Sequence, residues 1–133
     1  MTKATHGIVY REIGKYKYML TVPYQYQTGI GGRSVVTDYY SLYNDGRLVV
    51  MDGYAWDGAS GPARDTETFM RASLVHDCLY QMMREDQLDK GYRKDADKIM
   101  RTIAREDGMG KVRAWYTYHA VRIFGGAHNR RQK

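Results

Sequence analysis

The spacing of hydrophobic residues changes near the middle of this chain, and that change limits the folds it can adopt. From Lys15 to Gln27, tyrosine, leucine and valine alternate with polar residues, which is the pattern of a half-buried strand. From Thr66 to Arg84 there is neither proline nor glycine, and apolar residues recur at the spacing of one helix face. A strand-rich half followed by a helical half predicts an α+β fold.

The first half predicts a small N-terminal antiparallel sheet. Asn44-Asp45-Gly46 separates two apolar runs, Ser34–Tyr43 and Arg47–Met51, and such a turn between two such runs is a strong hairpin signal. Pro23 interrupts the earlier run, which is typical of a strand end or an edge strand. We expect about three or four strands in this part.

The second half predicts three helices, of which the first two are antiparallel. They span Thr66–Arg84, Tyr92–Glu106 and Lys111–Phe124, and Gly125-Gly126 supplies a stop for the third. The third helix has an apolar stripe on one side, formed by Val112, Trp115, Tyr116, His119 and Ile123. We expect one domain over residues 1–133, with a β-rich part at 1–52, a helical part at 53–125 and a basic tail at 126–133.

Charge and cysteine content limit the compartment and the partners. The 133-residue chain has a net charge of +6 and one cysteine, Cys78, so it has no internal disulfide. Its start has no signal sequence, and no apolar run approaches the ~20 residues of a membrane span. We expect the protein to stay in a reducing cytoplasm unless it leaves by another route. The positive charge favours acidic partners, such as nucleic acid or anionic lipid.

The segment between the two halves, Gly53–Pro62, is a candidate metal-binding loop. It offers backbone carbonyl oxygens together with the Asp57 carboxylate, and oxygen-only ligands in an irregular loop suit Ca²⁺. The alternative is a plain turn in which Asp57 bonds to backbone amides, since such turns are common. Both interpretations stay open on the loop alone.

The predicted first helix carries a candidate base. His76 and Tyr80 are four residues apart and share a helix face, while Asp77 is rotated by about 100°. The second helix carries Asp97 at the edge of its apolar stripe, where a carboxylate is costly unless a histidine or tyrosine receives it. Asp95 is an alternative to Asp97 as the carboxylate that meets the histidine, but its helix neighbours place it toward solvent. We predict that the antiparallel helix pair brings His76 and Tyr80 to Asp97.

This arrangement suits ester hydrolysis without a covalent intermediate. A carboxylate bonded to one imidazole nitrogen, as predicted for Asp97 and His76, leaves the other nitrogen free to take a proton from water. A Ca²⁺ ion held by Asp77, Asp57 and the Gly58 carbonyl would polarise an ester carbonyl and stabilise the oxyanion. The residues therefore predict a calcium-dependent esterase with His76 as its general base.

These residues resemble the phospholipase A2 superfamily, specifically its bacterial and fungal secreted branch. The hallmark of that family is a His-Asp pair and then a tyrosine, here His76-Asp77 and Tyr80, after a calcium loop similar to Trp56-Asp57-Gly58-Ala59-Ser60. Its dyad aspartate is matched by Asp97-Lys98-Ile99-Met100, and its last segment is similar to Ala114–Gly125. The resemblance implies a phospholipase A2-like helix pair, a catalytic dyad of His76 and Asp97 with Tyr80 bonded to Asp97, bound Ca²⁺, and a phospholipid or membrane surface as partner.

The stretch Val50–Tyr80 is also similar to a domain family common in tailed bacteriophage genomes. The likeness lies in Asp57-Gly58-Ala59-Ser60 followed by His76-Asp77 and Tyr80. It implies a viral protein located in the cytoplasm of a bacterial host, with association with the virion left open.

Two other classes of function compete with the enzyme. A phage virion or assembly protein could retain the phospholipase-like scaffold without catalysis, and other virion proteins would then be its partners. Nucleic-acid binding would use the basic residues toward the C-terminus, but the chain lacks a recognition motif, so we do not expect it. Those basic residues are Arg113, Arg122, Arg130, Arg131 and Lys133.

Overall fold

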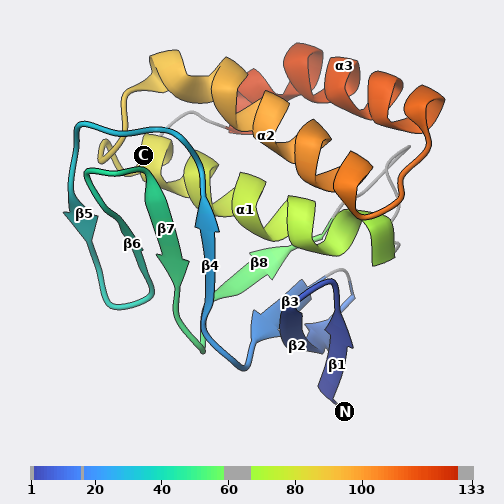
Figure 1. Ribbon diagram of the computed structural model, residues 1–133, viewed down its shortest axis with the longest axis horizontal. Helices are drawn as coiled ribbons and strands as arrows, with labels where there is room; N and C mark the ends of the chain where they lie inside the picture. Colours follow the sequence, from blue (N-terminus) through green and yellow to red (C-terminus); the bar gives the residue numbers. More distant parts are fainter. Residues whose placement is uncertain (1, 16, 59–66, 129–133) are drawn as a thin grey trace. The chain divides into compact units, whose positions relative to one another are not determined.

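The strands and the helices of this protein lie in separate parts of the chain. The computed structural model describes residues 2–15, 17–58 and 67–128, and the chain divides into two compact units, Met1–Asp57 and Gly58–Lys133. Within the described residues, the strands belong to the first unit and the three α-helices to the second, as the colours of Figure 1 show. The predicted α+β class, with antiparallel strands followed by three helices, is confirmed.

The first unit contains two antiparallel sheets, where the sequence predicts a single smaller one. One sheet has the strand order β1-β2-β3-β8 and the other β4-β7-β6-β5. β8 pairs with β3, so this unit extends to Asp57 and beyond the boundary expected at residue 52. The strands are β1 (Thr2–Thr5), β2 (Ile8–Gly14), β3 (Lys17–Leu20), β4 (Tyr24–Gln27), β5 (Val35–Val36), β6 (Tyr40–Leu42), β7 (Arg47–Val50) and β8 (Ala55–Asp57).

Two tight turns connect neighbouring strands. The predicted hairpin is confirmed, because β6 and β7 pair antiparallel on either side of Asn44-Asp45-Gly46, where Gly46 has a φ of 89°. The hairpin of β1 and β2 was not predicted. Its turn residues, His6 and Gly7, both have positive φ, which is the backbone of a type I′ turn and matches the twist of the flanking strands.

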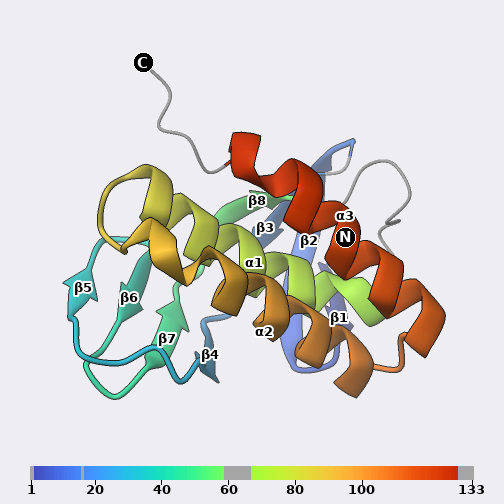
Figure 2. The same ribbon diagram turned by 90° about the horizontal axis from the view of Figure 1, so that it is seen from above.

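The second unit contains the three helices and one short 3₁₀ turn. These are α1 (Glu67–Arg84), η1 (Lys90–Tyr92), α2 (Arg93–Glu106) and α3 (Lys111–His128). Figure 2 shows α2 running antiparallel both to α1 and to α3. The predicted antiparallel pair is therefore present. None of the helices described here is both long and apolar enough to cross a membrane.

The third helix does not end at Gly125-Gly126, contrary to the prediction. It continues to His128, and Gly125 is buried within it. A Cβ atom on Gly125 would lie 2.8 Å from the Tyr80 hydroxyl oxygen. Glycine stands at this position because α3 approaches α1 closely at Tyr80, and not because the chain turns there.

The apolar stripe predicted for α3 faces outward. Val112, Trp115, Tyr116 and Ile123 are exposed, while the buried side of the helix carries Ala114, Thr117, Tyr118 and Gly125. The buried side is therefore mostly small, which suits close packing against the other helices. The larger apolar side chains of α3 contribute little to the core.

Replacement of the two adjacent glycines tests the close approach of α3 to α1. Gly125→Ala should lower the free energy of unfolding by about 1–3 kcal/mol, because the new methyl group collides with Tyr80. Gly126→Ala is the matched control. Its Cβ would lie 3.9 Å from Cζ of Arg93, an ordinary contact, so it should be neutral or stabilising by up to about 1 kcal/mol. Urea unfolding followed by circular dichroism measures both, and equal stability of the two variants would contradict the packing.

Candidate functional site

Asp97 is a fully buried carboxylate on the inner face of α2. It lies beside Ala96, Met100 and Ile103, which form the buried stripe of that helix. Asp95, two residues earlier, is exposed. Because of the helical repeat, Asp97 lies on the same buried face as the apolar stripe, whereas Asp95 lies on the exposed face.

His76 and Tyr80 of α1 both bond to the same oxygen of Asp97. Nε2 of His76 lies 2.8 Å from Oδ1, and the Tyr80 hydroxyl donates to Oδ1 at 2.6 Å. The two rings are stacked at a tilt, with centroids 4.1 Å apart. An ionised carboxylate can only accept, so Nε2 carries a proton and Nδ1 of the neutral ring is an acceptor. The structure thus brings together the three residues predicted for the dyad and its tyrosine.

Two arginines that the sequence does not predict as partners of Asp97 complete its surroundings. Nη1 of Arg122, on α3, donates to Oδ2 at 2.8 Å, and Nη1 of Arg93 lies 3.9 Å from the same oxygen. Arg93 also donates to the backbone carbonyls of Val121 and Arg122. Its spacing of four residues from Asp97 on one helix is a signal that could have identified it. Arg122 reaches Asp97 from another helix, and no local pattern predicts such a contact.

The network keeps Asp97 ionised and Tyr80 protonated. Burial raises the pKa of Asp97, but hydrogen bonds from His76, Tyr80 and Arg122 outweigh it and hold that pKa below its ordinary value. Burial, reinforced by the hydrogen bond to Asp97, raises the pKa of Tyr80 far above its ordinary value. The Tyr80 hydroxyl is therefore a donor, and Asp97 an acceptor, over the whole physiological pH range.

The His76 ring is enclosed but not sealed. Its side chain is 11% exposed, and within the described residues no group forms a hydrogen bond with Nδ1. The ring therefore has one nitrogen committed to Asp97 and a second that can accept a proton. This is the arrangement of a positioned general base.

The residues predicted to bind calcium lie at the junction of the chain's two halves and on α1. Asp57 ends β8, is exposed, and lies 3.9 Å from Nζ of Lys17. Gly58 follows it and is half-buried, while Asp77 is half-buried on α1. Among the residues described, no three or more His, Cys, Asp or Glu side chains gather in a group that could hold a metal ion. Residues 59–62 of the predicted loop and Thr66 at the predicted start of the first helix lie outside the described residues, as do Arg130, Arg131 and Lys133 of the basic tail.

The fold and the site define an α+β protein with a histidine–aspartate–tyrosine network buried between helices. The chain belongs to the family described as Protein of unknown function (DUF1353), whose sequence model matches residues 34–121. The matched segment contains His76, Tyr80, Arg93 and Asp97, and it ends one residue before Arg122. No curated protein and no solved structure matches the chain.

Acid unfolding tests the role of Asp97. Its lowered folded-state pKa means that it contributes stability above its unfolded pKa of about 3.9, and that this contribution is lost as the pH falls toward the folded value. Asp97→Asn should cost about 1–3 kcal/mol at neutral pH, and its stability should then fall less steeply below about pH 4. Asp95→Asn, which changes an exposed residue in the first turn of the same helix, should cost at most about 1 kcal/mol through the helix dipole. Urea unfolding at several pH values measures this, and parallel curves for Asp97→Asn and wild type would contradict it.

Proposed function

We propose that this protein is a phospholipase A2-like lipid esterase in which His76 activates a water molecule. The observation that carries the proposal is the buried bond of 2.8 Å between Nε2 of His76 and Oδ1 of Asp97, with the Tyr80 hydroxyl on the same oxygen. This pairing sets the tautomer of the ring and leaves Nδ1 as the proton acceptor. The likeness to the phospholipase A2 hallmark at His76-Asp77 and Tyr80 supplies the substrate class.

The proposed reaction transfers one proton twice. Nδ1 of His76 takes a proton from water while the water oxygen adds to the ester carbonyl carbon. The tetrahedral intermediate then breaks its bond to the alcohol oxygen, and His76 returns the proton to that oxygen. Asp97 stabilises the imidazolium ring between the two steps, and Tyr80 holds the carboxylate in place. Fatty acid and alcohol are the products, and no covalent enzyme intermediate forms.

Arg122 and Arg93 modify this dyad. Both guanidinium groups face Oδ2 of Asp97, on the side away from the oxygen that bonds His76. Arg122 helps to keep the carboxylate ionised, and both guanidinium groups offset part of its negative charge. In this protein Asp97 acts mainly by orienting the ring.

We propose Ca²⁺ as the cofactor. The predicted donors are the Asp57 and Asp77 carboxylates and the Gly58 carbonyl, and such hard oxygen ligands suit Ca²⁺ rather than zinc, which favours imidazole and thiolate. When bound, the ion would polarise the ester carbonyl. A bacteriophage origin, with the protein in the host cytoplasm or associated with the virion, belongs to the same proposal and has its support in the sequence resemblance.

The enclosure of the network favours one alternative, a non-catalytic phage virion or assembly protein. Asp97 is fully buried, with three hydrogen-bond donors and the nearby Arg93 around it, and only 11% of the His76 side chain is exposed. A network of this kind also stabilises a helical scaffold without any chemistry. Activity measurements separate the two functions.

Calorimetry tests the metal. Titration of the wild-type protein with Ca²⁺ should give binding that Asp77→Asn weakens strongly, because the ion loses a charged oxygen ligand. Asp95→Asn is a control with the same change of charge at an exposed position, and it should bind Ca²⁺ as wild type does. Equal calcium affinity of Asp77→Asn and wild type would remove Asp77 from the site.

Release of fatty acid tests the activity. Purified protein is incubated with mixed phospholipid vesicles and, separately, with a short-chain phospholipid dissolved as monomers, with Ca²⁺ or with a chelator. His76→Gln should lose about 10²- to 10⁴-fold in rate, since a positioned base is removed. His6→Gln, in the turn between β1 and β2, should keep the wild-type rate. The chelator should abolish release.

One result would favour the scaffold instead. It is the absence of fatty acid release above the His76→Gln background, across several phospholipids in both physical forms and at millimolar Ca²⁺. His76 would then be a structural residue of the helical unit.

A further inference from the structure

The outer face of α3 carries a row of apolar side chains that are exposed to solvent. Val112, Trp115, Tyr116 and Ile123, with His119 between them, recur at the spacing of one helix face and all are exposed. From Val112 to Ile123 the stripe spans about 17 Å along the helix axis. Exposed apolar side chains are normal when they are scattered singly, whereas a contiguous row of them indicates a binding surface.

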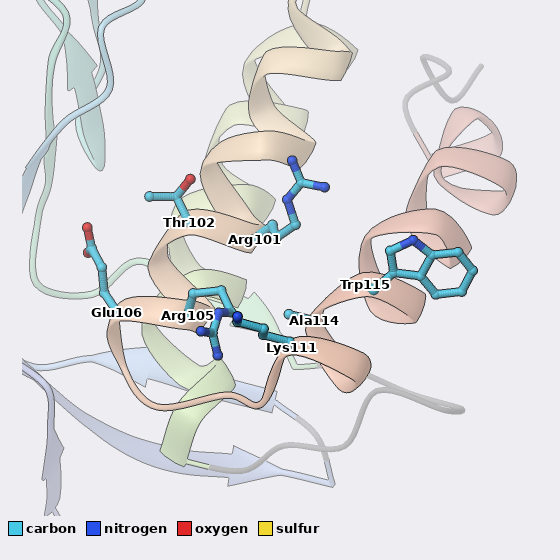
Figure 3. A pocket seen from close by; sticks show the side chains of 7 residues that line it. All are labelled: Arg101, Thr102, Arg105, Glu106, Lys111, Ala114 and Trp115. Atoms are coloured by element: carbon cyan, nitrogen blue, oxygen red, sulfur yellow. The ribbon is translucent and has the colours of Figure 1, made fainter.

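The charges around this stripe are positive. No aspartate or glutamate occurs from Lys111 to His128. At the start of α3, a cleft of about 480 Å³ lies between α2 and α3 and is lined by Arg101, Arg105 and Lys111. Figure 3 shows Arg101 and Arg105 on α2, and Lys111 and Trp115 on α3. The one carboxylate in the cleft, Glu106, is held by Arg71 at 2.8 Å.

We propose that the outer face of α3 docks on the surface of an anionic lipid bilayer. Its tryptophan and tyrosine are the aromatic residues enriched at the boundary between lipid and water, and cations beside an apolar helix face are attracted to acidic headgroups. A second copy of the chain fits less well, because α3 carries cations and no carboxylate from Lys111 to His128, so two such helices have no opposite charges to pair. The choice of lipid over an acidic protein rests on the proposed function.

The two tryptophans make binding directly measurable. Trp115 is 60% exposed, whereas Trp56 is only 4% exposed and packs against Tyr10 and Tyr18 in the first unit. Vesicles of phosphatidylglycerol should therefore shift the emission of Trp115 to shorter wavelength. Phosphatidylcholine vesicles should not, and added salt should reduce the shift. The measurement uses a chelator and the His76→Gln variant, so that no hydrolysis takes part.

Two variants with the same change of charge locate the surface. Ile123→Asp and Val36→Asp each replace an exposed apolar side chain with a carboxylate. Ile123 is 72% exposed and Val36 is 70% exposed. Ile123 lies on the α3 stripe, and Val36 on β5. Ile123→Asp should weaken vesicle binding by about tenfold or more, since it loses buried apolar area and meets acidic lipid. Val36→Asp should bind nearly as well as wild type.

Several outcomes would overturn this inference. Two of them concern vesicles: no shift of Trp115 emission on anionic vesicles, or an equal loss of vesicle binding in Ile123→Asp and Val36→Asp. The others point to a different partner: binding to polyglutamate but not to vesicles, or a dimer in gel filtration that Ile123→Asp dissociates. Vesicle binding without ester hydrolysis would keep the inference and reject the proposed function. Hydrolysis of the monomeric phospholipid without vesicle binding would reject the inference and keep the proposed function.

Discussion

A carboxylate buried at Asp97 is costly unless charged or polar partners surround it, and each of the three α-helices of the second unit supplies at least one. α1 contributes His76 and Tyr80, α2 contributes Arg93, and α3 contributes Arg122. The helices must therefore keep a fixed register, since a shift of α1 or of α3 relative to α2 would remove the hydrogen bonds that this helix donates to the carboxylate. Gly125 of α3 passes close to Tyr80, which is one of these partners.

The same network sets what the site can do chemically. Because Asp97 stays ionised and accepts from Nε2, the second nitrogen of His76 is the only one that can take a proton. Arg122 and Arg93 offset part of the charge of the carboxylate, and the hydrogen bonds from His76, Tyr80 and Arg122 keep it ionised in its buried position. Orientation of the ring is thus the main contribution of Asp97 to the proposed reaction.

Local spacing made the helices and the position of Asp97 predictable. The contact with His76 could also be predicted, because a carboxylate on an apolar stripe needs a donor from the next helix. The role of Arg122 and the packing of Gly125 could not, since both depend on how α3 lies against α1, which no local pattern encodes. Periodicity identified the apolar stripe of α3 but not whether it is covered. The β1–β2 hairpin was missed although His6-Gly7 offered a turn signal.

The central claim is that His76 offers Nδ1 as a proton acceptor while Nε2 is bonded to Asp97. Nitrogen NMR of the His76 imidazole at neutral pH tests it most directly, because the chemical shifts of the two ring nitrogens report which one carries hydrogen. The predicted result is a neutral ring with hydrogen on Nε2 and none on Nδ1. A ring with hydrogen on Nδ1, either alone or together with Nε2, would contradict the claim, because no free acceptor would remain for the proton of water.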